Sequence, residues 1–146
     1  MKSVMFVCLG NICRSPIAEG CAKKLVKENA LDIKIASSGT GNWHVGEAPC
    51  ENSTKVCQNN DVDISNLRAS QFTKKDIQAY DLIVALDDSN YNDLKSMGVE
   101  NLVKLGEYGY DSEDVPDPYF FNGFEGFDKV FTMIDDCVKN LFKERF

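Results

Sequence analysis

The chain has 146 residues, of which 43% are hydrophobic and 27% are charged, so we expect one soluble globular domain over residues 1–146. A formal net charge of −7 disfavours general binding to nucleic acid or to an anionic membrane. No apolar run approaches the length of a membrane span, and the N-terminus carries no signal-peptide pattern, so we expect a cytoplasmic protein.

The first predicted element is a buried strand that ends at Cys8. The four residues before Cys8 are apolar without alternation, which is typical of a parallel strand covered on both faces. The loop that follows contains Gly10 and Asn11, which tolerate left-handed backbone angles and let the loop amides turn toward one point. Ser15 and Pro16 then predict a helix start, with Ser15 as the N-cap. Loop and helix N-terminus together predict a site for a phosphate-sized anion.

Cys8 and Arg14 supply the chemistry of this predicted site. A thiol beside a helix N-terminus and an arginine is expected to be a thiolate near neutral pH. Arg14 can hold two phosphoryl oxygens at once, and the hydroxyl of Ser15 can donate to the sulfur. Taken alone, Cys8 would be a buried strand-end cysteine and Arg14 a solvated charge. Their coincidence with the loop and the helix start favours a nucleophilic site.

The rest of the chain alternates between strand and helix patterns. We predict, in order, a helix over 17–29, a strand from 33 that ends at 37–39, a Gly-rich loop over 39–49, a short helix over 49–60, a helix start at 73, a buried strand over 81–86, a helix from 87–89 to 98, a strand over 102–105 and an amphipathic helix over 127–142. Such alternation predicts an α/β protein with a parallel sheet covered on both faces. Right-handed crossovers place the loops after the strands along one edge, so Cys8, Ser37, Asp87 and the loop after Leu105 should face one crevice.

Trp43 and Asp117 lie in two of these loops. An aromatic residue in a Gly-rich loop is either a partial cap on the core or part of a ligand site at the strand ends. Asp117 lies between two prolines that restrict its backbone, and a carboxylic acid over the site could protonate the leaving oxygen of a phosphomonoester. An ordinary Asp-Pro turn is the simpler alternative. Composition also leaves other acids within reach, namely Asp111, Glu113 and Asp114.

Several of these segments resemble one known family, the low-molecular-weight protein tyrosine phosphatases. The stretch from Cys8 to Ser15 is similar to the family's Cys-x5-Arg-Ser signature. The similarity continues, in the expected order, in the segments 16–19 (Pro-Ile-Ala-Glu), 37–40 (Ser-Ser-Gly-Thr), 87–90 (Asp-Asp-Ser-Asn) and 117–119 (Asp-Pro-Tyr). The resemblance implies a three-layer αβα fold with a four-stranded parallel sheet in the order 2-1-3-4 and a phosphate-binding loop after the first strand.

The resemblance also implies an activity and a set of site residues. The protein would be a phosphoric monoester hydrolase, acting on phosphotyrosine and small aryl phosphates through a phosphocysteine intermediate. Cys8 would be the nucleophile, Arg14 the phosphate clamp and Asp117 the general acid and base. The phosphate-binding loop would contain Leu9, Gly10, Asn11, Ile12, Cys13 and Ser15, with Ser37 and Asp87 as supports and Trp43, Tyr119 and Phe120 lining the substrate pocket.

Cofactors and partners follow from the same comparison. No metal or other cofactor is implied, and the chain has six cysteines but one histidine and no Cys-x2-Cys pair, which disfavours structural zinc. The expected partners are phosphotyrosine proteins or small aryl phosphates, with phosphate and similar oxyanions as inhibitors, and we expect a monomer. In the family a cysteine at the position of Cys13 can form a reversible disulfide with the nucleophile. Cys21 and Cys137 lie in helix patterns and are predicted to be packing residues.

The chain departs from the family pattern near its loop supports. The family usually has a histidine near Asn66 or Leu67 and often an arginine before Gln71, where this chain has Ser70. Two other functions remain as alternatives. A thioredoxin-linked arsenate reductase would need two more redox cysteines after the strand over 81–86, where Asp87 and Asp88 stand, whereas Cys50 and Cys57 lie in another helix. A phosphocysteine carrier or a phosphotyrosine-binding module would show no turnover of an aryl phosphate.

Overall fold

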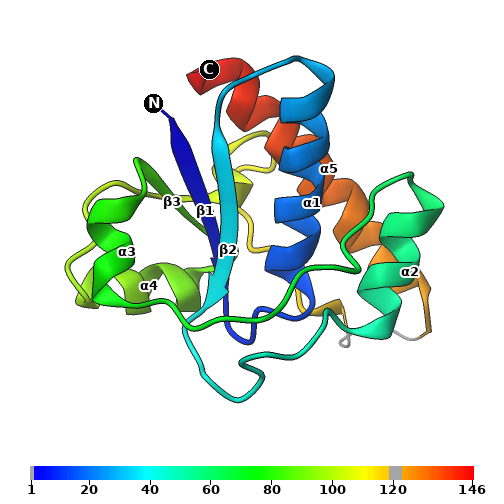
Figure 1. The fold of residues 1–146 in the computed structure, drawn as a ribbon, viewed down its shortest axis with the longest axis horizontal. Helices are drawn as coiled ribbons and strands as arrows, with labels where there is room; N and C mark the ends of the chain where they lie inside the picture. Colours follow the sequence, from blue (N-terminus) through cyan, green and yellow to red (C-terminus); the bar gives the residue numbers. More distant parts are fainter. Residues whose placement is uncertain (1, 119–122) are drawn as a thin grey trace.

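The computed structural model describes residues 2–118 and 123–146. Its centre is a parallel sheet built from β1 (Ser3–Cys8), β2 (Lys34–Gly39), β3 (Leu82–Ala85) and β4 (Leu102–Lys104). The strands lie in the order β2-β1-β3-β4, so β1 has a neighbour on each side (Figure 1). The predicted α/β fold and strand order are therefore confirmed.

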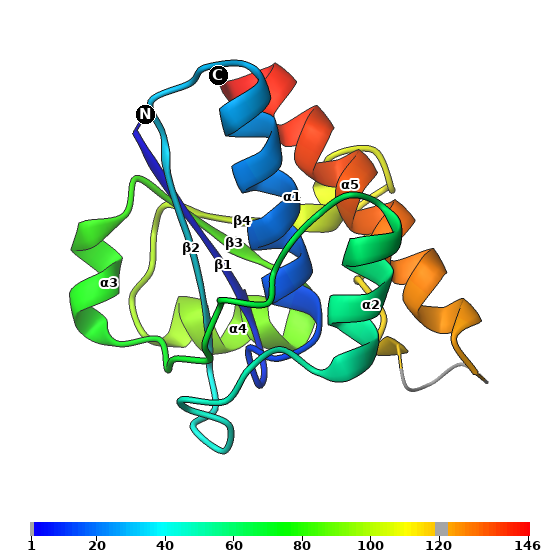
Figure 2. The same cartoon turned by 45° about the vertical axis from the view of Figure 1, so that its right-hand side comes forward.

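Helices cover both faces of this sheet, as Figures 1 and 2 show. The helices are α1 (Arg14–Glu28), α2 (Glu51–Asn59), α3 (Lys74–Ala79), α4 (Asp88–Ser96) and α5 (Glu125–Arg145), with a 3-10 turn η1 at Leu105–Glu107. In both views α1, α2 and α5 lie on one side of the sheet, and α3 and α4 lie on the other. The result is the three-layer arrangement that the resemblance implied.

The absence of alternation in β1 follows from this two-sided cover. Val4 and Phe6 belong to the core beneath α1 and α5, whereas Met5 and Val7 belong to the core beneath α3 and α4. Successive side chains of a strand point to opposite faces, so a strand between two cores must be apolar at every position. This burial holds β1, and with it Cys8 at its end, in the middle of the molecule.

The two long helices start or end beyond their predicted limits. The predicted N-cap at Ser15 is wrong, because α1 begins at Arg14 and Ser15 lies buried in its first turn, where its hydroxyl contacts Cys8 and Asn11 instead. Helix α5 extends past both predicted ends, with acidic residues in its first turn and basic residues in its last, which suits the helix dipole. The residues predicted to face inward from α5 are all buried: Phe131, Ile134, Val138 and Leu141.

Among the helices of residues 2–118 and 123–146, none is both long enough and apolar enough to cross a bilayer. 

Candidate active site

The carboxyl ends of the strands meet around one pocket, as the parallel topology predicts. The pocket has a volume of about 220 Å³ and lies where β1 passes into the loop 9–13. Its lining residues are Cys8, Leu9, Gly10, Ile12, Cys13, Arg14, Trp43, His44 and Asp117. The residues predicted for the nucleophile, the phosphate clamp and the acid therefore line the same pocket.

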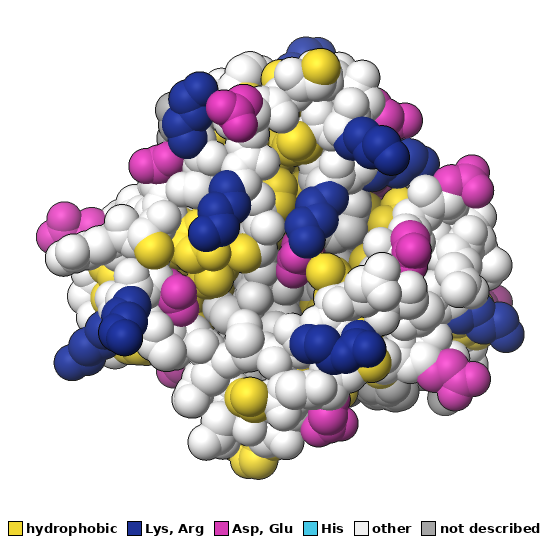
Figure 3. All heavy atoms as spheres, in the orientation of Figure 1, with side chains coloured by type: hydrophobic (Ala, Val, Ile, Leu, Met, Phe, Trp, Pro, Cys, Tyr) yellow, Lys and Arg dark blue, Asp and Glu magenta, His cyan; other side chains and the backbone are white. Residues whose placement is uncertain are grey.

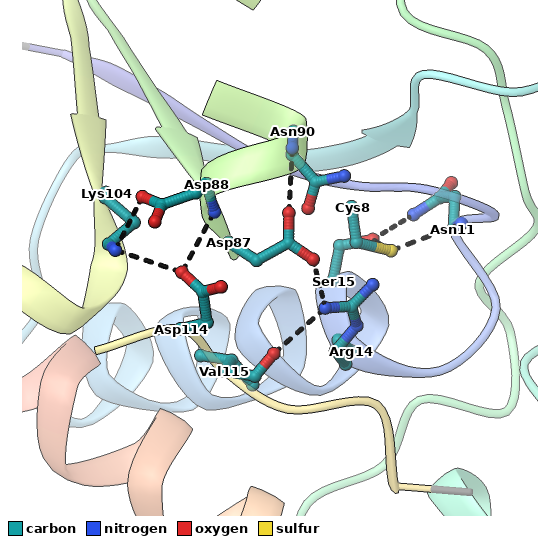
Figure 4. A network of polar contacts seen from close by, with 10 residues as sticks. All are labelled: Cys8, Asn11, Arg14, Ser15, Asp87, Asp88, Asn90, Lys104, Asp114 and Val115. Atoms are coloured by element: carbon teal, nitrogen blue, oxygen red, sulfur yellow. Dashed lines mark hydrogen bonds and ion pairs between the residues drawn. The ribbon is translucent and has the colours of Figure 1, made fainter. Parts of the chain in front are cut away.

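The thiol of Cys8 lies at the centre of a small set of hydrogen-bond donors (Figure 4). The side chain is only 2% exposed. Its Sγ lies 3.0 Å from the hydroxyl oxygen of Ser15 and accepts a hydrogen bond of 3.3 Å from the backbone N–H of Asn11. Donors aimed at the sulfur, together with the nearby N-terminus of α1, stabilise negative charge on this atom.

Asn11 connects the loop to its supports and sets the direction of these hydrogen bonds. It has a φ of 58°, a left-handed angle that asparagine tolerates better than most residues. Its Nδ2 donates to Ser15 Oγ (2.7 Å) and Ser37 Oγ (2.9 Å), while its Oδ1 accepts from the backbone N–H of Ser70 (2.9 Å). Because Ser15 accepts from Asn11, its own proton is available to the sulfur of Cys8. When the sulfur of Cys8 is a thiolate, which cannot donate, the hydroxyl of Ser15 is the donor in this contact.

The same reasoning extends the network to a buried carboxylate. Ser37 accepts from Asn11, so its hydroxyl proton goes to Oε1 of Glu19. Glu19 is 7% exposed and forms an ion pair with Lys23 one turn along α1. The sequence pattern missed Glu19, because an acid in a helix is usually exposed to solvent and its local pattern does not show that this one is buried.

Ser70 explains how the loop is supported without the family's usual side chains. Its backbone N–H, rather than its side chain, holds the Oδ1 of Asn11, and any residue except proline provides that donor. Leu67, near the position where a histidine was expected, is instead partly buried against the main core. The loop of this chain is thus braced by a backbone amide, two serines and Glu19.

Removing the side chain of Asn11 is expected to destabilise the protein. Asn11→Ala leaves Ser15, Ser37 and the Ser70 amide short of a partner and keeps the left-handed angle, so the free energy of unfolding should fall by about 2–4 kcal/mol. Asn11→Gly removes the same contacts but relieves the backbone, and should be about 1 kcal/mol more stable than the alanine variant. Urea denaturation measures both. A glycine variant as stable as the wild type would show that the side-chain contacts contribute nothing.

Arg14 is held at the pocket by an ion pair and a backbone carbonyl. Its Nη1 donates to Oδ2 of Asp87 (2.7 Å) and to the carbonyl oxygen of Val115 (2.9 Å). Asp87 is itself fixed, because its other oxygen accepts from the N–H of Asn90 at the start of α4. Burial alone would lower the pKa of Arg14, but the nearby Cys8 and Asp87 outweigh it and raise the pKa above its usual value. The guanidinium therefore stays charged and oriented, as the predicted support by Asp87 requires.

Of the acids that the sequence left open, the structure places Asp117 at the pocket. Asp114 accepts hydrogen bonds from the N–H of Asp88 and from Nζ of Lys104, on the other side of Asp87 (Figure 4). Glu113 lines a different hollow beside α5, and Asp111 is an exposed residue with a φ of 52°. The predicted pocket residues Tyr119 and Phe120 lie outside the residues that the structure describes.

Exposed side chains form the rim of the pocket. Leu9 is 48% exposed and Trp43 is 69% exposed, both unusually high for large apolar residues that also line a pocket. Gly41 permits this position of Trp43, because a Cβ at residue 41 would lie 1.9 Å from the indole ring. His44 also lines the pocket and pairs with Glu47, a contribution that the sequence pattern did not indicate.

The other cysteines fall into two groups. Cys21 and Cys137 are buried packing residues, as predicted, and burial raises the pKa of Cys137 to about 12. Cys13 differs, because its Sγ lies 2.8 Å from the Sγ of Cys50 at the start of α2. The hydrogen bond with Cys50 and burial raise the pKa of Cys13 well above its ordinary value. The sequence had associated Cys13 with Cys8 alone and had set Cys50 aside.

The molecular surface around these elements is of mixed character. Figure 3 shows lysine and arginine side chains interspersed with acidic ones over the face that carries β2 and α1, rather than one continuous basic field. In the part of the chain that the structure describes, no group of three or more histidine, cysteine or acidic side chains is arranged to hold a metal ion. Among the residues that line the pocket, Arg14 carries a positive charge, and the backbone N–H groups at the start of α1 add partial positive charge.

Comparisons with known proteins agree on the family. The model of the low molecular weight phosphotyrosine protein phosphatase family matches residues 3–145. The low molecular weight protein-tyrosine-phosphatase PtpA of Staphylococcus aureus is 39% identical, with 99% of this chain and 96% of that protein covered. A protein tyrosine phosphatase from Entamoeba histolytica has a similar structure, with a TM-score of 0.91, 29% identity and coverage of 99% and 96% of the two chains. So does a Drosophila arginine phosphatase, with a TM-score of 0.91, 30% identity and coverage of 99% and 97%. The chain belongs to the low-molecular-weight protein tyrosine phosphatase family, whose members hydrolyse phosphotyrosine with a cysteine nucleophile.

Proposed function

We propose that Cys8, Arg14 and Asp117 of this phosphatase act as nucleophile, phosphate clamp and general acid and base on aryl phosphates. The observation that carries the proposal is that all three residues line one pocket, with hydrogen-bond donors already directed at the sulfur of Cys8. Each residue type suits its role, since the reaction needs an anionic nucleophile, a fixed cation and a proton source.

In the first step the thiolate of Cys8 attacks phosphorus, and an S–P bond forms as the P–O bond to the phenol breaks. Arg14 and the amides of the loop 9–13 hold the non-bridging oxygens, which carry the developing charge. Asp117 gives its proton to the leaving phenol. The ion pair with Asp87 keeps Arg14 in position and leaves its second terminal nitrogen directed to the pocket side (Figure 4).

In the second step water hydrolyses the phosphocysteine. Asp117, now a carboxylate, takes a proton from the attacking water, and the S–P bond breaks to release phosphate. Ser15 supports this step, because its hydroxyl donates to Cys8 and stabilises the departing thiolate. Positive charge from Arg14 and the backbone amides stabilises the phosphoryl group in both steps.

The rim of the pocket favours an aromatic group on the phosphate. Leu9 and Trp43 present apolar surface at the entrance, and a phenyl ring that enters between them removes that surface from water. An alkyl phosphate lacks the flat ring and would bury less. The Drosophila relative is named an arginine phosphatase, so phosphoarginine is the substrate against which this preference has to be measured.

The direct test is hydrolysis of a phosphotyrosine peptide and of 4-nitrophenyl phosphate by the reduced protein in the presence of a chelator. We expect turnover of both substrates, competitive inhibition by inorganic phosphate, and a much lower kcat/KM for a phosphoarginine peptide. Preference for phosphoarginine would overturn the aryl assignment while retaining the cysteine chemistry. No turnover of any phosphate ester would favour a carrier or binding module instead.

An arsenate reductase can be tested in the same preparation, by following arsenite formation with thioredoxin and its reductase. We expect none, because the positions after the predicted strand over 81–86, where the redox cysteines would stand, are occupied by Asp87 and Asp88, and both aspartates have structural contacts. Asp87 holds Arg14, and the backbone N–H of Asp88 and its carboxylate join Asp114 and Lys104. Arsenite production coupled to thioredoxin oxidation would contradict the assignment.

A further inference from the structure

Two cysteines from distant parts of the sequence have their sulfur atoms in contact beside the active site. The Sγ atoms of Cys13, at the end of the phosphate-binding loop, and Cys50, the N-cap of α2, lie 2.8 Å apart, and both residues are partly buried. A disulfide bond is about 2.05 Å long, so the sulfurs would have to approach by only about 0.8 Å to form one.

The end of the loop 9–13 and the start of α2 are also held together by two hydrogen bonds in which neither sulfur takes part. The backbone N–H of Cys50 donates to the carbonyl oxygen of Ile12 (2.8 Å). The hydroxyl of Ser53, which is fully buried, donates to the carbonyl oxygen of Cys13 (3.1 Å). Because the backbones are anchored to each other, the closeness of the two thiols does not depend on the rotamers of Cys13 and Cys50 alone.

The donors and acceptors of the remaining hydrogen bonds show where the thiol protons of Cys13 and Cys50 lie. Ser53 has already used its proton on the carbonyl of Cys13, so its oxygen accepts the S–H of Cys50, 3.0 Å away. The S–H of Cys13 is then left to donate to the sulfur of Cys50. Cys50 also sits at the positive end of α2, which favours its thiolate when the proton leaves.

Cys13 also lies near the nucleophile. Cys8 and Cys13 line the same pocket and interact electrostatically, whereas Cys50 contacts Cys13 but does not line the pocket. The three sulfurs therefore form a series, with Cys13 in the middle. We propose that Cys13 and Cys50 form a reversible disulfide that takes over the oxidation of Cys8 and returns Cys8 to its thiolate.

The oxidant in the proposed reactions is a hydroperoxide such as hydrogen peroxide. Its O–O bond breaks as the thiolate of Cys8 takes one oxygen, giving a sulfenic acid and hydroxide. The thiol of Cys13 then forms an S–S bond with Cys8, the S–O bond breaks, and water leaves with the proton of Cys13. Finally the thiolate of Cys50 attacks the sulfur of Cys13, the bond to Cys8 breaks, and Cys8 departs as a thiolate.

The three reaction steps balance in atoms and electrons without another reactant. The proton lost by Cys50 neutralises the hydroxide from the first step, so one peroxide and two thiols give one disulfide and two waters. The last exchange is favoured because Cys8 leaves as a thiolate that the Asn11 amide and the Ser15 hydroxyl stabilise. A tenfold preference for the Cys13–Cys50 bond, equivalent to about 30 mV, leaves about nine-tenths of the oxidised molecules with a free Cys8.

Peptide mapping of the whole protein tests the pairing directly. The protein is treated with one equivalent of hydrogen peroxide, its free thiols are alkylated, and it is digested with trypsin. Cys8 and Cys13 fall together in peptide 3–14, whereas Cys50 is the cysteine of peptide 35–55. We expect a crosslink between these peptides through Cys13, with Cys8 alkylated. A disulfide internal to 3–14, a crosslink through Cys8, or no disulfide would overturn the proposal.

Activity after the same treatment supplies the second measurement. The wild type should keep most of its phosphatase activity without added reductant, whereas Cys50→Ala and Cys50→Ser should lose most of theirs until dithiothreitol is added. Cys57→Ala is the matched control, since Cys57 lies in the same helix but is fully buried, and it should behave as the wild type. Equal protection in the Cys50 variants would contradict the relay.

The relay rests on Cys8 being the reactive thiolate of the proposed phosphatase, but the two readouts fail separately. The mapping detects cysteines and needs no turnover, so a Cys13–Cys50 crosslink in a protein that hydrolyses nothing would support the pairing and sink the proposed catalytic roles. Normal hydrolysis together with a disulfide confined to Cys8 and Cys13 would support the proposed catalytic roles and contradict the Cys13–Cys50 pairing.

Discussion

Replacing Cys8 by serine is expected to reduce kcat for 4-nitrophenyl phosphate by about 10⁴- to 10⁶-fold, the range typical of a lost covalent nucleophile. Serine keeps the size and the hydrogen bonds of the position, so the pocket should persist. It is not ionised near neutral pH and is a poor leaving group from phosphorus, so both chemical steps are lost. Phosphate release, followed at enzyme concentrations high enough to detect slow turnover, measures the effect.

Two controls separate lost chemistry from lost structure. Inorganic phosphate should still bind to Cys8→Ser and raise its melting temperature, because the donors that hold the anion are Arg14 and the loop amides. Cys57→Ala, in which a buried thiol that does not line the pocket is removed, should retain full kcat. If Cys8→Ser retained more than about a hundredth of the wild-type kcat, the nucleophile would have to be another group.

The fold could be predicted from local patterns because each of its main elements has a strong signal. β1 is apolar from residue 4 to residue 8 and lies between two cores, so the burial of these side chains outweighs any weaker local propensity. The start of α1 was misplaced for a specific reason. Ser15 has the chemistry of an N-cap, but its hydroxyl is engaged by Cys8 and Asn11, a long-range demand that local rules do not contain.

The candidate site was predictable to the extent that its residues are adjacent in sequence. Cys8 ends β1, Asn11 lies in the loop that follows and Arg14 begins α1. The parallel topology then brings Asp87 and Asp117 to the same edge of the sheet. The partners that were missed are separated from the loop by tens of residues. Cys50 approaches Cys13 across 37 positions, and the N–H of Ser70 reaches Asn11 across 59. A backbone donor in particular has no side-chain signature.

Glu19 shows a different limit. It was within a segment that resembled the family, yet nothing in its local pattern distinguished it from a solvated helical acid. Only the three-dimensional network shows that it accepts from Ser37 and lies behind the nucleophile. Its charge is compensated by Lys23, so a buried carboxylate can orient the serine and asparagine donors without an unpaired charge.

Replacing Asp117 by asparagine is expected to reduce kcat/KM by about 10²- to 10⁴-fold for phenyl phosphate, because the departing phenolate then leaves without a proton. The reduction in kcat/KM should be much smaller for 4-nitrophenyl phosphate, whose nitrophenolate is stable unprotonated. Asparagine has nearly the same shape as aspartate but cannot transfer a proton. Because Asp117 would also act as the base in the second step, kcat/KM is the quantity to compare, since it does not contain the hydrolysis of the phosphocysteine. Measuring kcat/KM for a series of aryl phosphates with increasingly basic phenols gives the dependence on the leaving group.

The matched control is Asp111→Asn, an exposed position in the same loop region at which asparagine tolerates the left-handed backbone. Asp111→Asn should leave the hydrolysis of phenyl phosphate and of 4-nitrophenyl phosphate unchanged. The decisive quantity is the slope of log kcat/KM against the pKa of the leaving phenol, which should be shallow for the wild type and steep for Asp117→Asn. Equal losses with every phenol would mean that Asp117 positions the substrate rather than protonating it, and the search for the acid would move to the neighbouring Glu113 and Asp114.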